Sequence, residues 1–246
     1  MQESTYIFGI RAIIEAINAG KNIEKIFMQK GLQGNLYSEL NGLIKSEKIT
    51  TSFVPVEKLE HLSKFQNHQG VAARISPIKY INLETLLTSV FESKEKPLFL
   101  LLDHIMDVRN FGAIIRTAEC TGVDGIIVPE TGAAPITAAT IKTSAGAAFK
   151  VPICKVNHLK DALFHLQSMD ISIVAATEKT NKTIYQTPLD KPLALIMGSE
   201  DRGINPSILK LVNYKAKLPL LGEIESLNVS VACGAFLYEI VRQRSH

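Results

Sequence analysis

The chain has 246 residues, of which 46% are hydrophobic and 21% charged, and its formal net charge is +3. This composition is typical of a folded globular protein and excludes a disordered or fibrous one. The charge neither requires nor excludes a nucleic-acid partner. The longest apolar runs are too short for a membrane span, and no export signal precedes them, so we expect a cytoplasmic protein.

Cysteine and histidine usage favours neither disulfides nor a metal. Cys120, Cys154 and Cys233 are far apart and have small or apolar neighbours, which is typical of buried thiols in a reducing compartment. The six histidines lack metal-ligand spacing. We therefore expect no metal site.

The first 76 residues predict a small α/β domain. Hydrophobic periodicity favours helices at residues 9–19, 36–46 and 57–65, and strands at residues 23–28, 51–56 and 70–75. Residues 77–96 hold prolines, charged side chains and one apolar helix-like patch at 83–91. We expect this stretch to be a linker.

From residue 97 onward, short apolar runs alternate with helical patterns. Strands are predicted at residues 98–102, 125–128, 152–156, 171–176, 193–197 and 214–218, and helices at 111–121, 138–147, 159–168, 206–212 and 227–243. Apolar runs without polar alternation are typical of strands covered on both faces. The pattern predicts a mostly parallel sheet between two helical layers, with candidate sites directly after the strands.

The first candidate segment runs from a strand end through a polar loop into a helix. Asn110 stands where a helix N-cap belongs, so capping is one interpretation of it. Arg116 follows Gly112 by one turn, where small side chains leave room for another chain or a ligand. Its guanidinium is suited to gripping a phosphate, and pairing with Glu119 is the alternative.

Two further segments follow predicted strands. In the first, Gly198 and Gly203 let the backbone approach a ligand closely, and Glu200 can accept hydrogen bonds, although a plain tight turn explains the loop nearly as well. In the second, Ser226 is a natural helix N-cap, whereas Asn228 is expected inside the first turn. The helix that follows is apolar over much of its surface, which predicts burial in the core or against another subunit.

Four ordered motifs together resemble the SpoU/TrmH family of RNA ribose 2′-O-methyltransferases. They are N-x-G-x-x-x-R-T-A-E at 110–119, S-A-G-A at 144–147, M-G-S-E-x-x-G at 197–203 and S-L-N-V-S at 226–230. F-G-I-R-A-I at 8–13 and H-Q-G-V-A-A at 68–73 look like the RNA-binding domain of the RlmB-like branch, whose members methylate a guanosine of 23S rRNA. The likeness spans nearly the whole chain.

This resemblance implies an L30e-like RNA-binding domain at residues 1–76, a linker at 77–96, and a SPOUT-type α/β catalytic domain at 97–246 whose C-terminal segment forms a trefoil knot. It also implies a homodimer, S-adenosylmethionine as the cofactor and RNA as the partner. The family's catalytic positions fall on Asn110, Arg116, Glu200, Ser226 and Asn228. Its cofactor contacts fall on Thr177, Gly198, Leu218 and Leu227.

Two alternatives remain open at this point. One keeps the chemistry and changes the substrate to a transfer RNA or to the ribosomal site protected by resistance methyltransferases; the N-terminal domain argues modestly against the transfer RNA. The other is a ribosome-assembly factor that binds rRNA without methylating it, against which the complete set of five matched positions argues. A conventional dinucleotide or phosphate binder is disfavoured because neither G-x-G-x-x-G nor a Walker loop is present.

Overall fold

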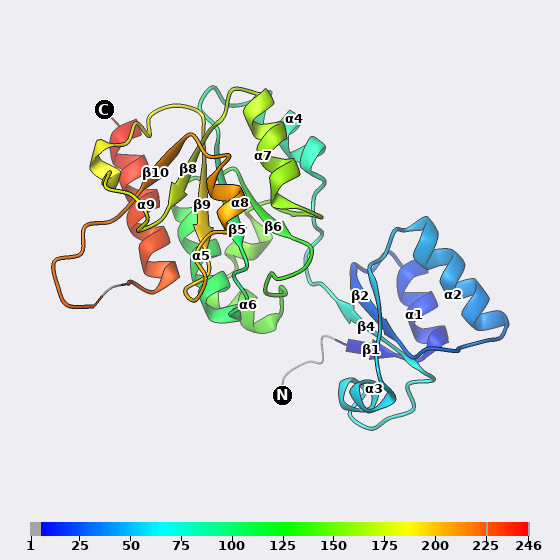
Figure 1. Cartoon of the computed structure of the whole chain (residues 1–246). Coiled ribbons are helices and arrows are strands. Elements are labelled where there is room, and N and C mark those ends of the chain that lie inside the picture. The colour runs from blue at the N-terminus through cyan, green and yellow to red at the C-terminus, as the bar shows by residue number, and fades with distance from the viewer. Residues whose placement is uncertain (1–5, 225, 246) are drawn as a thin grey trace. The chain divides into compact units, whose positions relative to one another are not determined.

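The computed structural model describes residues 6–224 and 226–245. It contains two compact units, Met1–Lys79 and Tyr80–His246 (Figure 1). Within the described residues, no helix is both long enough and apolar enough to cross a membrane.

The first unit is built on a four-stranded mixed sheet in the order β1-β4-β2-β3. β4 is antiparallel to β1 and β2, while β2 and β3 are parallel. The elements in chain order are β1 (Tyr6–Phe8), α1 (Ile10–Asn18), β2 (Ile23–Met28), α2 (Asn35–Ser46), β3 (Thr51–Phe53), α3 (Val56–Leu62) and β4 (Val71–Ile75).

Two apolar clusters hold the helices of this unit to its sheet. On one face, α1 and α2 bury Ile13, Ile14 and Leu40 against the strands. On the other face, Leu59 of α3 packs against Phe27 and Ala72. The amphipathic helical spacing predicted these helices, whereas the three residues of β1 are too few to show a period.

The second unit contains a six-stranded sheet in the order β10-β8-β9-β5-β6-β7, and every neighbouring pair is parallel. Its strands are β5 (Leu98–Asp103), β6 (Gly125–Pro129), β7 (Ile153–Val156), β8 (Ser172–Ala176), β9 (Leu193–Gly198) and β10 (Tyr214–Ala216). Its helices are α4 (Leu83–Phe91), α5 (Val108–Cys120), α6 (Ala138–Thr143), η1 (Ala147–Phe149), α7 (Leu159–Ser168), η2 (Ile184–Gln186), α8 (Pro206–Leu209) and α9 (Val229–Arg244).

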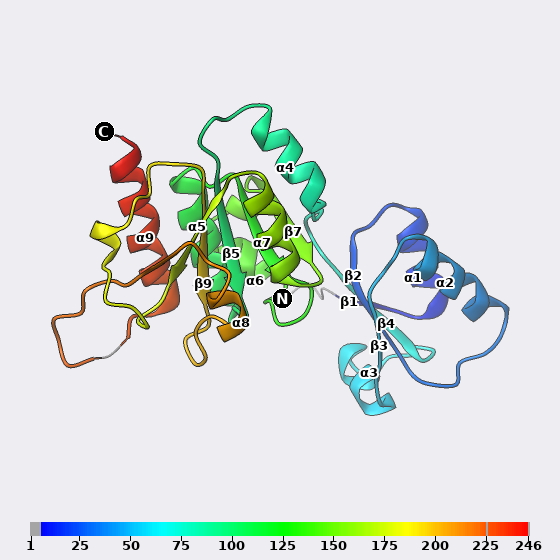
Figure 2. The same cartoon turned by 45° about the horizontal axis from the view of Figure 1, so that its top comes forward.

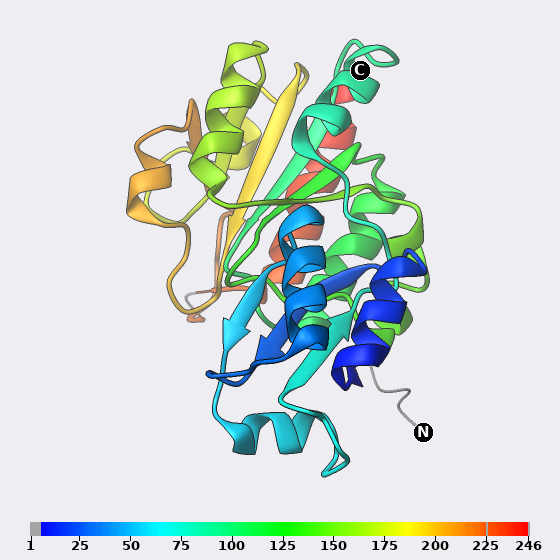
Figure 3. The same ribbon diagram turned by 90° about the vertical axis from the view of Figure 1, so that its right-hand side faces the viewer.

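Helices cover both faces of this parallel sheet, as the unalternated strands predicted. Leu86 of α4, Leu163 of α7 and Ile208 of α8 belong to one apolar cluster with the strands. The other layer contains α5, which packs against both α6 and α9. Figure 3 shows α7 (yellow-green) on one side of the sheet and α9 (red) on the other. The α/β fold class is therefore confirmed.

The stretch predicted as a linker contributes to the second unit. The apolar patch at residues 83–91 forms α4, and its Leu86, Leu87 and Val90 are buried in that unit's core. Asn82 caps the helix by accepting hydrogen bonds from the backbone N–H groups of Glu84 and Thr85.

Several predicted elements prove shorter in the structure, each for a local reason. The helix predicted at 138–147 ends at Thr143, because Ala145 and Gly146 have positive φ angles of 51° and 84°. The strand predicted at 51–56 ends at Phe53, because Pro55 is the N-cap of α3.

Two of the three predicted buried cysteines are buried. Burial raises the pKa of the Cys154 and Cys233 thiols to about 12. The prediction is wrong for Cys120, which is exposed at the last residue of α5. Among the described residues, no group of three or more His, Cys, Asp or Glu side chains could hold a metal ion.

Candidate active site

The candidate site lies where the strand order of the parallel sheet reverses. β5 and β9 are neighbours, yet the chain leaves β5 toward β6 and leaves β9 toward β10 on the opposite side. Loops that diverge in this way open a crevice at the carboxyl ends of the two strands, where ligands bind in sheets of this kind. Asp103 and Gly198 are paired at this point.

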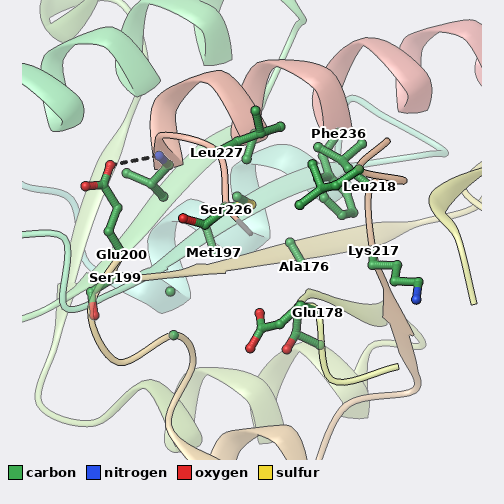
Figure 4. A pocket seen from close by; sticks show the side chains of 16 residues that line it. Ala176, Glu178, Met197, Ser199, Glu200, Lys217, Leu218, Ser226, Leu227 and Phe236 are labelled. Atoms are coloured by element: carbon green, nitrogen blue, oxygen red, sulfur yellow. Dashed lines mark hydrogen bonds between the residues drawn. The ribbon is translucent and has the colours of Figure 1, made fainter. Parts of the chain in front are cut away.

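Glu200, in the loop after β9, is the centre of a hydrogen-bonded cluster. Its Oε1 accepts from Asn228 Nδ2 at 2.7 Å and from Asn110 Nδ2 at 3.2 Å. It also accepts from the backbone N–H of Val229 at 2.9 Å, the bond dashed in Figure 4. Asn228 Nδ2 also donates to Asn110 Oδ1 at 3.0 Å. Three segments separated by up to 118 residues therefore converge on one carboxylate.

Electrostatics favour this placement. The carboxylate lies at the N-terminus of α9, where unpaired N–H groups and the helix dipole stabilise a negative charge. Among the described residues, no hydrogen-bond donor contacts the second oxygen, Oε2, which leaves it available to a ligand. Glu200 thus fixes two amide side chains and can still accept a hydrogen bond.

Two capping interpretations from the sequence are wrong. Asn228, expected inside the first turn of the last helix, is its N-cap and accepts from the backbone N–H groups of Ser230 and Val231. Ser226 lies two residues earlier and is exposed. Asp107 rather than Asn110 caps α5, so the amide of Asn110 is free to contact Glu200.

Glycine is required in the loop after β9. A Cβ on Gly198 would lie 2.2 Å from the backbone carbonyl carbon of Gly203 and 2.3 Å from the backbone nitrogen of Ile204. Gly203 itself has a φ of +64°, and its N–H donates to the carbonyl of Ser199 at 2.9 Å. The loop therefore folds back on itself tightly and places Glu200 at its tip.

A cleft runs from this cluster along the carboxyl ends of β8 and β9 (Figure 4). Its volume is about 150 Å³, or about 710 Å³ when the space open to solvent is counted. Six of the nine predicted site residues line it: Thr177, Gly198, Glu200, Leu218, Ser226 and Leu227. Asn110 and Asn228 do not line the cleft themselves, but both are hydrogen-bonded to Glu200, which does.

Part of the cleft wall comes from the long chain segment between β10 and α9, drawn in orange in Figure 2. This segment leaves the sheet after Ala216 and returns at Asn228. The backbone N–H of Thr177 donates to the carbonyl of Ala216 at 2.9 Å, which ties the end of β8 to the start of the segment.

Arg116 is the predicted site residue that does not join this assembly within one chain. It is exposed on α5 and is absent from the residues that line the cleft. In the part of the chain that the structure describes, its side chain makes no ion pair. Glu119, the alternative partner, pairs with Lys150 Nζ at 3.1 Å instead. The guanidinium is therefore available to a ligand or to another chain.

Sequence reasoning missed several apolar residues of the cleft. Ala176, Met197, Ala232 and Phe236 line it, and Phe236 comes from the middle of α9. The sequence predicts burial of that helix's apolar surface in the core or against another subunit. The i, i+4 spacing of Ala232 and Phe236 places them on one face of the helix, but nothing in the sequence distinguishes a cleft wall from a core.

Comparison with family models matches both units. The model described as SpoU rRNA Methylase family matches residues 97–238. The model described as RNA 2′-O ribose methyltransferase substrate binding matches residues 6–81.

Comparison with curated proteins finds relatives that align over the whole chain. A Bacillus subtilis protein named for the TrmH family of tRNA/rRNA methyltransferases, YacO, is 32% identical and is covered to 98%, with 99% of this chain aligned. A Staphylococcus aureus (strain MSSA476) protein named for the same family is 36% identical, with 98% of this chain and 97% of the relative covered.

Solved structures share the fold. AviRb, a SpoU methyltransferase of Streptomyces viridochromogenes solved with AdoMet, gives a TM-score of 0.62 at 23% identity, covering 98% of this chain and 90% of its own. An AdoMet-bound rRNA methyltransferase of Sinorhizobium meliloti gives 0.60 at 22% identity, covering 96% and 86%. A TrmH/SpoU tRNA modifying enzyme of A. aeolicus gives 0.57 at 30% identity, covering 66% and 84%.

Proposed function

Because the chain belongs to the SpoU rRNA methylase family, we propose that it transfers a methyl group from S-adenosylmethionine to a ribose 2′-hydroxyl of RNA. The observation that carries this proposal is the cluster of Asn110, Glu200 and Asn228 at the edge of an apolar cleft. A cleft for the donor and polar groups for the acceptor sugar are what such a reaction needs side by side.

The chemistry of the cleft suits S-adenosylmethionine. Met197, Leu218 and Phe236 offer an apolar surface for the adenine ring, and the backbone of Gly198 lines the same cleft. Glu178, which also lines the cleft, can accept hydrogen bonds from ribose hydroxyls. We assign main-chain groups around Gly198, Leu218 and Leu227 to cofactor binding, with Thr177 at the adjacent strand end. The bound cofactor would supply the electrophilic methyl group.

Positioning is the main contribution of the protein to this reaction. An in-line displacement requires the 2′-oxygen to face the methyl group, and its proton must leave. We propose that Glu200, Asn228 and Ser226 shape the ribose pocket, and that Asn110 holds the loop through Glu200. Arg116 would hold the phosphate of the target nucleotide and contact its 2′-hydroxyl. A guanidinium resists deprotonation strongly, so positioning rather than proton abstraction is its role in this proposal.

A homodimer would reconcile the exposed Arg116 with this role. Since its guanidinium does not line the cleft of its own chain, we propose that it serves the site formed with a second copy. The trefoil knot implied by the resemblance and the cytoplasmic location expected from the sequence stay predictions.

The first unit is our candidate for the main RNA contact. β1, β2 and β3 end at one edge of its sheet and β4 begins there, which gathers four loops. Phe53 and Phe65 are 56% and 73% exposed in this unit, and Lys30 and Phe53 line the same surface hollow. Exposed aromatic rings beside lysines suit unpaired bases and phosphates.

Ribosomal RNA is the substrate class we favour, with a guanosine of 23S rRNA as the target. The S. meliloti rRNA methyltransferase matches 96% of this chain, whereas the A. aeolicus tRNA modifying enzyme matches 66%. A fold shared over both units supports an rRNA substrate, because the tRNA enzyme accounts for less of the chain.

Calorimetry with S-adenosylmethionine tests the cofactor assignment. We expect one site per chain and a large loss of affinity in Gly198→Ala, while Phe53→Ala keeps the wild-type cofactor affinity and weakens RNA binding. Absence of cofactor binding in the wild-type protein would instead support a non-catalytic rRNA-binding factor.

A further inference from the structure

A second cavity lies at the same carboxyl edge of the parallel sheet. It is bordered by the ends of β5, β6 and β7 and by the start of α8, and it does not share a lining residue with the cleft described above. Its volume is about 550 Å³, or about 1040 Å³ when the space open to solvent is counted. Sites for small ligands in proteins span roughly 300–1,000 Å³, so this cavity is large enough for a nucleotide.

His104 is held in a defined orientation at this cavity. Its Nδ1 lies 2.6 Å from Oδ1 of Asp103, whose side chain is buried, and Oδ2 of Asp103 accepts from the backbone N–H of Asn205 at 2.8 Å. The imidazole packs against Gly132, where a Cβ would lie 2.6 Å from the ring carbon Cδ2. Because Nδ1 is engaged, Nε2 is the ring nitrogen left for a ligand.

The backbone of His104 supports a functional reading. Its φ of +60° is in the left-handed region, which is uncommon and costs free energy in a non-glycine residue. His104 thus has a strained backbone, and its imidazole is held between the buried carboxylate of Asp103 and Gly132 while it stays half exposed.

The other polar side chains that line the cavity include groups of both charges. His158 and Lys160, at the start of α7, are exposed and line it, as do Asp161 and Ser207. Lys160 and Asp161 bring charges of both signs to the cavity, so a ligand with several kinds of polar group suits it better than a bare anion. Flat imidazoles together with hydrogen-bond donors and acceptors instead suit a nucleobase, which has a π-face and polar edges.

One loop forms part of the wall of both cavities. Gly198, Glu200 and Gly203 line the candidate active site, and Asn205, two residues later, lines the second cavity. The two cavities are therefore adjacent along this loop.

We propose that this cavity binds an unpaired nucleotide of the RNA substrate adjacent to the methylated one, with His104, His158 and Lys160 as its recognition residues. The inference rests on the proposed function for the identity of the RNA. The base lies against the imidazoles and is read by Nε2 of His104, while Lys160 contacts the flanking phosphate. The site sets which sequence around the target is accepted.

The test measures RNA binding and cofactor binding separately in the full-length protein. His104→Asn, His158→Ala and Lys160→Ala are compared with His165→Ala, an exposed histidine of α7 outside the cavity. Asparagine is chosen at 104 because it tolerates a positive φ. We expect each cavity variant to raise the Kd for a 23S rRNA fragment by roughly tenfold, with the cofactor Kd within twofold of wild type and His165→Ala unchanged.

A base scan of the RNA supplies a second readout. Replacing the nucleotides beside the target one at a time should weaken binding to the wild type at one position, and His104→Asn should lose that discrimination. Unchanged RNA affinity in all three cavity variants would overturn the proposal. So would guanosine monophosphate or another free nucleotide that binds with the same dependence on His104 but is not displaced by RNA.

Failure of the proposed function would look different. Wild-type protein that binds RNA through the cavity residues but transfers no methyl group would refute the transferase assignment and support the recognition site. If His104→Asn does not fold, the exposed His158 and Lys160 variants still decide the question, since truncating exposed side chains rarely unfolds a protein.

Discussion

Substitutions at Asn228 should distinguish most clearly between its role as a helix cap and its role in the Glu200 cluster. Asn228→Ala removes the N-cap of α9, worth about 1 kcal/mol, and two hydrogen bonds from Nδ2, at 2.7 Å to Glu200 and 3.0 Å to Asn110. These bonds are partly exposed, so we assign about 0.5 kcal/mol to each. The expected loss is about 2 kcal/mol, which in a unit of this size lowers Tm by about 4–8 °C.

Asn228→Asp distinguishes the cap from the cluster. The aspartate keeps an acceptor for the N–H groups of Ser230 and Val231, but it replaces the donor to Glu200 with a second carboxylate. We expect the cap to survive and the cluster to separate through repulsion between like charges. Because salt screens that repulsion, the stability deficit of Asn228→Asp should shrink at high ionic strength, while that of Asn228→Ala should not.

The assay is urea denaturation followed by circular dichroism, at low and high salt, with methyl transfer measured on the same preparations. Asn181→Ala is the matched control, since Asn181 is exposed. A double-mutant cycle between Asn228→Ala and Glu200→Ala should give a coupling energy of at least about 0.5 kcal/mol. Additive effects, or a Tm of Asn228→Ala equal to that of the control, would refute the cluster as described.

Three further substitutions probe other parts of the structure. Gly198→Ala forces a Cβ to 2.2 Å from the Gly203 backbone, so cofactor affinity should fall far more than helix content does. Calorimetry measures the affinity and circular dichroism the helix content; an unchanged cofactor Kd would contradict the prediction. Arg116→Ala should abolish methyl transfer with the cofactor Kd within a few-fold and stability within about 0.5 kcal/mol, because the side chain is exposed; undiminished turnover would refute its role. A hydrogen bond from Arg242 lowers the pKa of Glu239 below its ordinary 4.5, so this carboxylate stabilises the fold at neutral pH and the gain is lost as pH falls below that value. Urea titrations at pH 7 and pH 4 should show a shallower acid loss in Glu239→Gln than in wild type.

Local patterns predicted most of the fold because apolar spacing reports directly on burial. The strand at Ile23–Met28 and the helix at Leu159–Ser168 match their predicted bounds. Predicted and observed element boundaries differ where the backbone conformation of a single residue ends the element, as at Ala145 and Pro55. The exposed Cys120 shows the limit of inferring burial from apolar neighbours, since its position on the helix surface decides its exposure.

The candidate site was predictable in its residues but not in their contacts. Glu200 and Asn228 stood out in the sequence, yet their hydrogen bond joins segments that only the sheet topology brings together. Asn228 was misplaced because a cap and a first-turn residue look alike without backbone angles. Phe236 was missed because an apolar helix face can line a cleft as well as a core. His104 was not predicted, because the sequence does not show that the neighbouring Asp103 is buried and holds the imidazole in place.

The most direct test of the account is to incubate the protein with S-adenosylmethionine labelled in its methyl group and with unmodified ribosomal RNA, and then to map the label. The account predicts one 2′-O-methylated ribose, at a guanosine of 23S rRNA, and loss of the label with Arg116→Ala. Label on a base rather than a ribose, on transfer RNA alone, or on no RNA at all would contradict it.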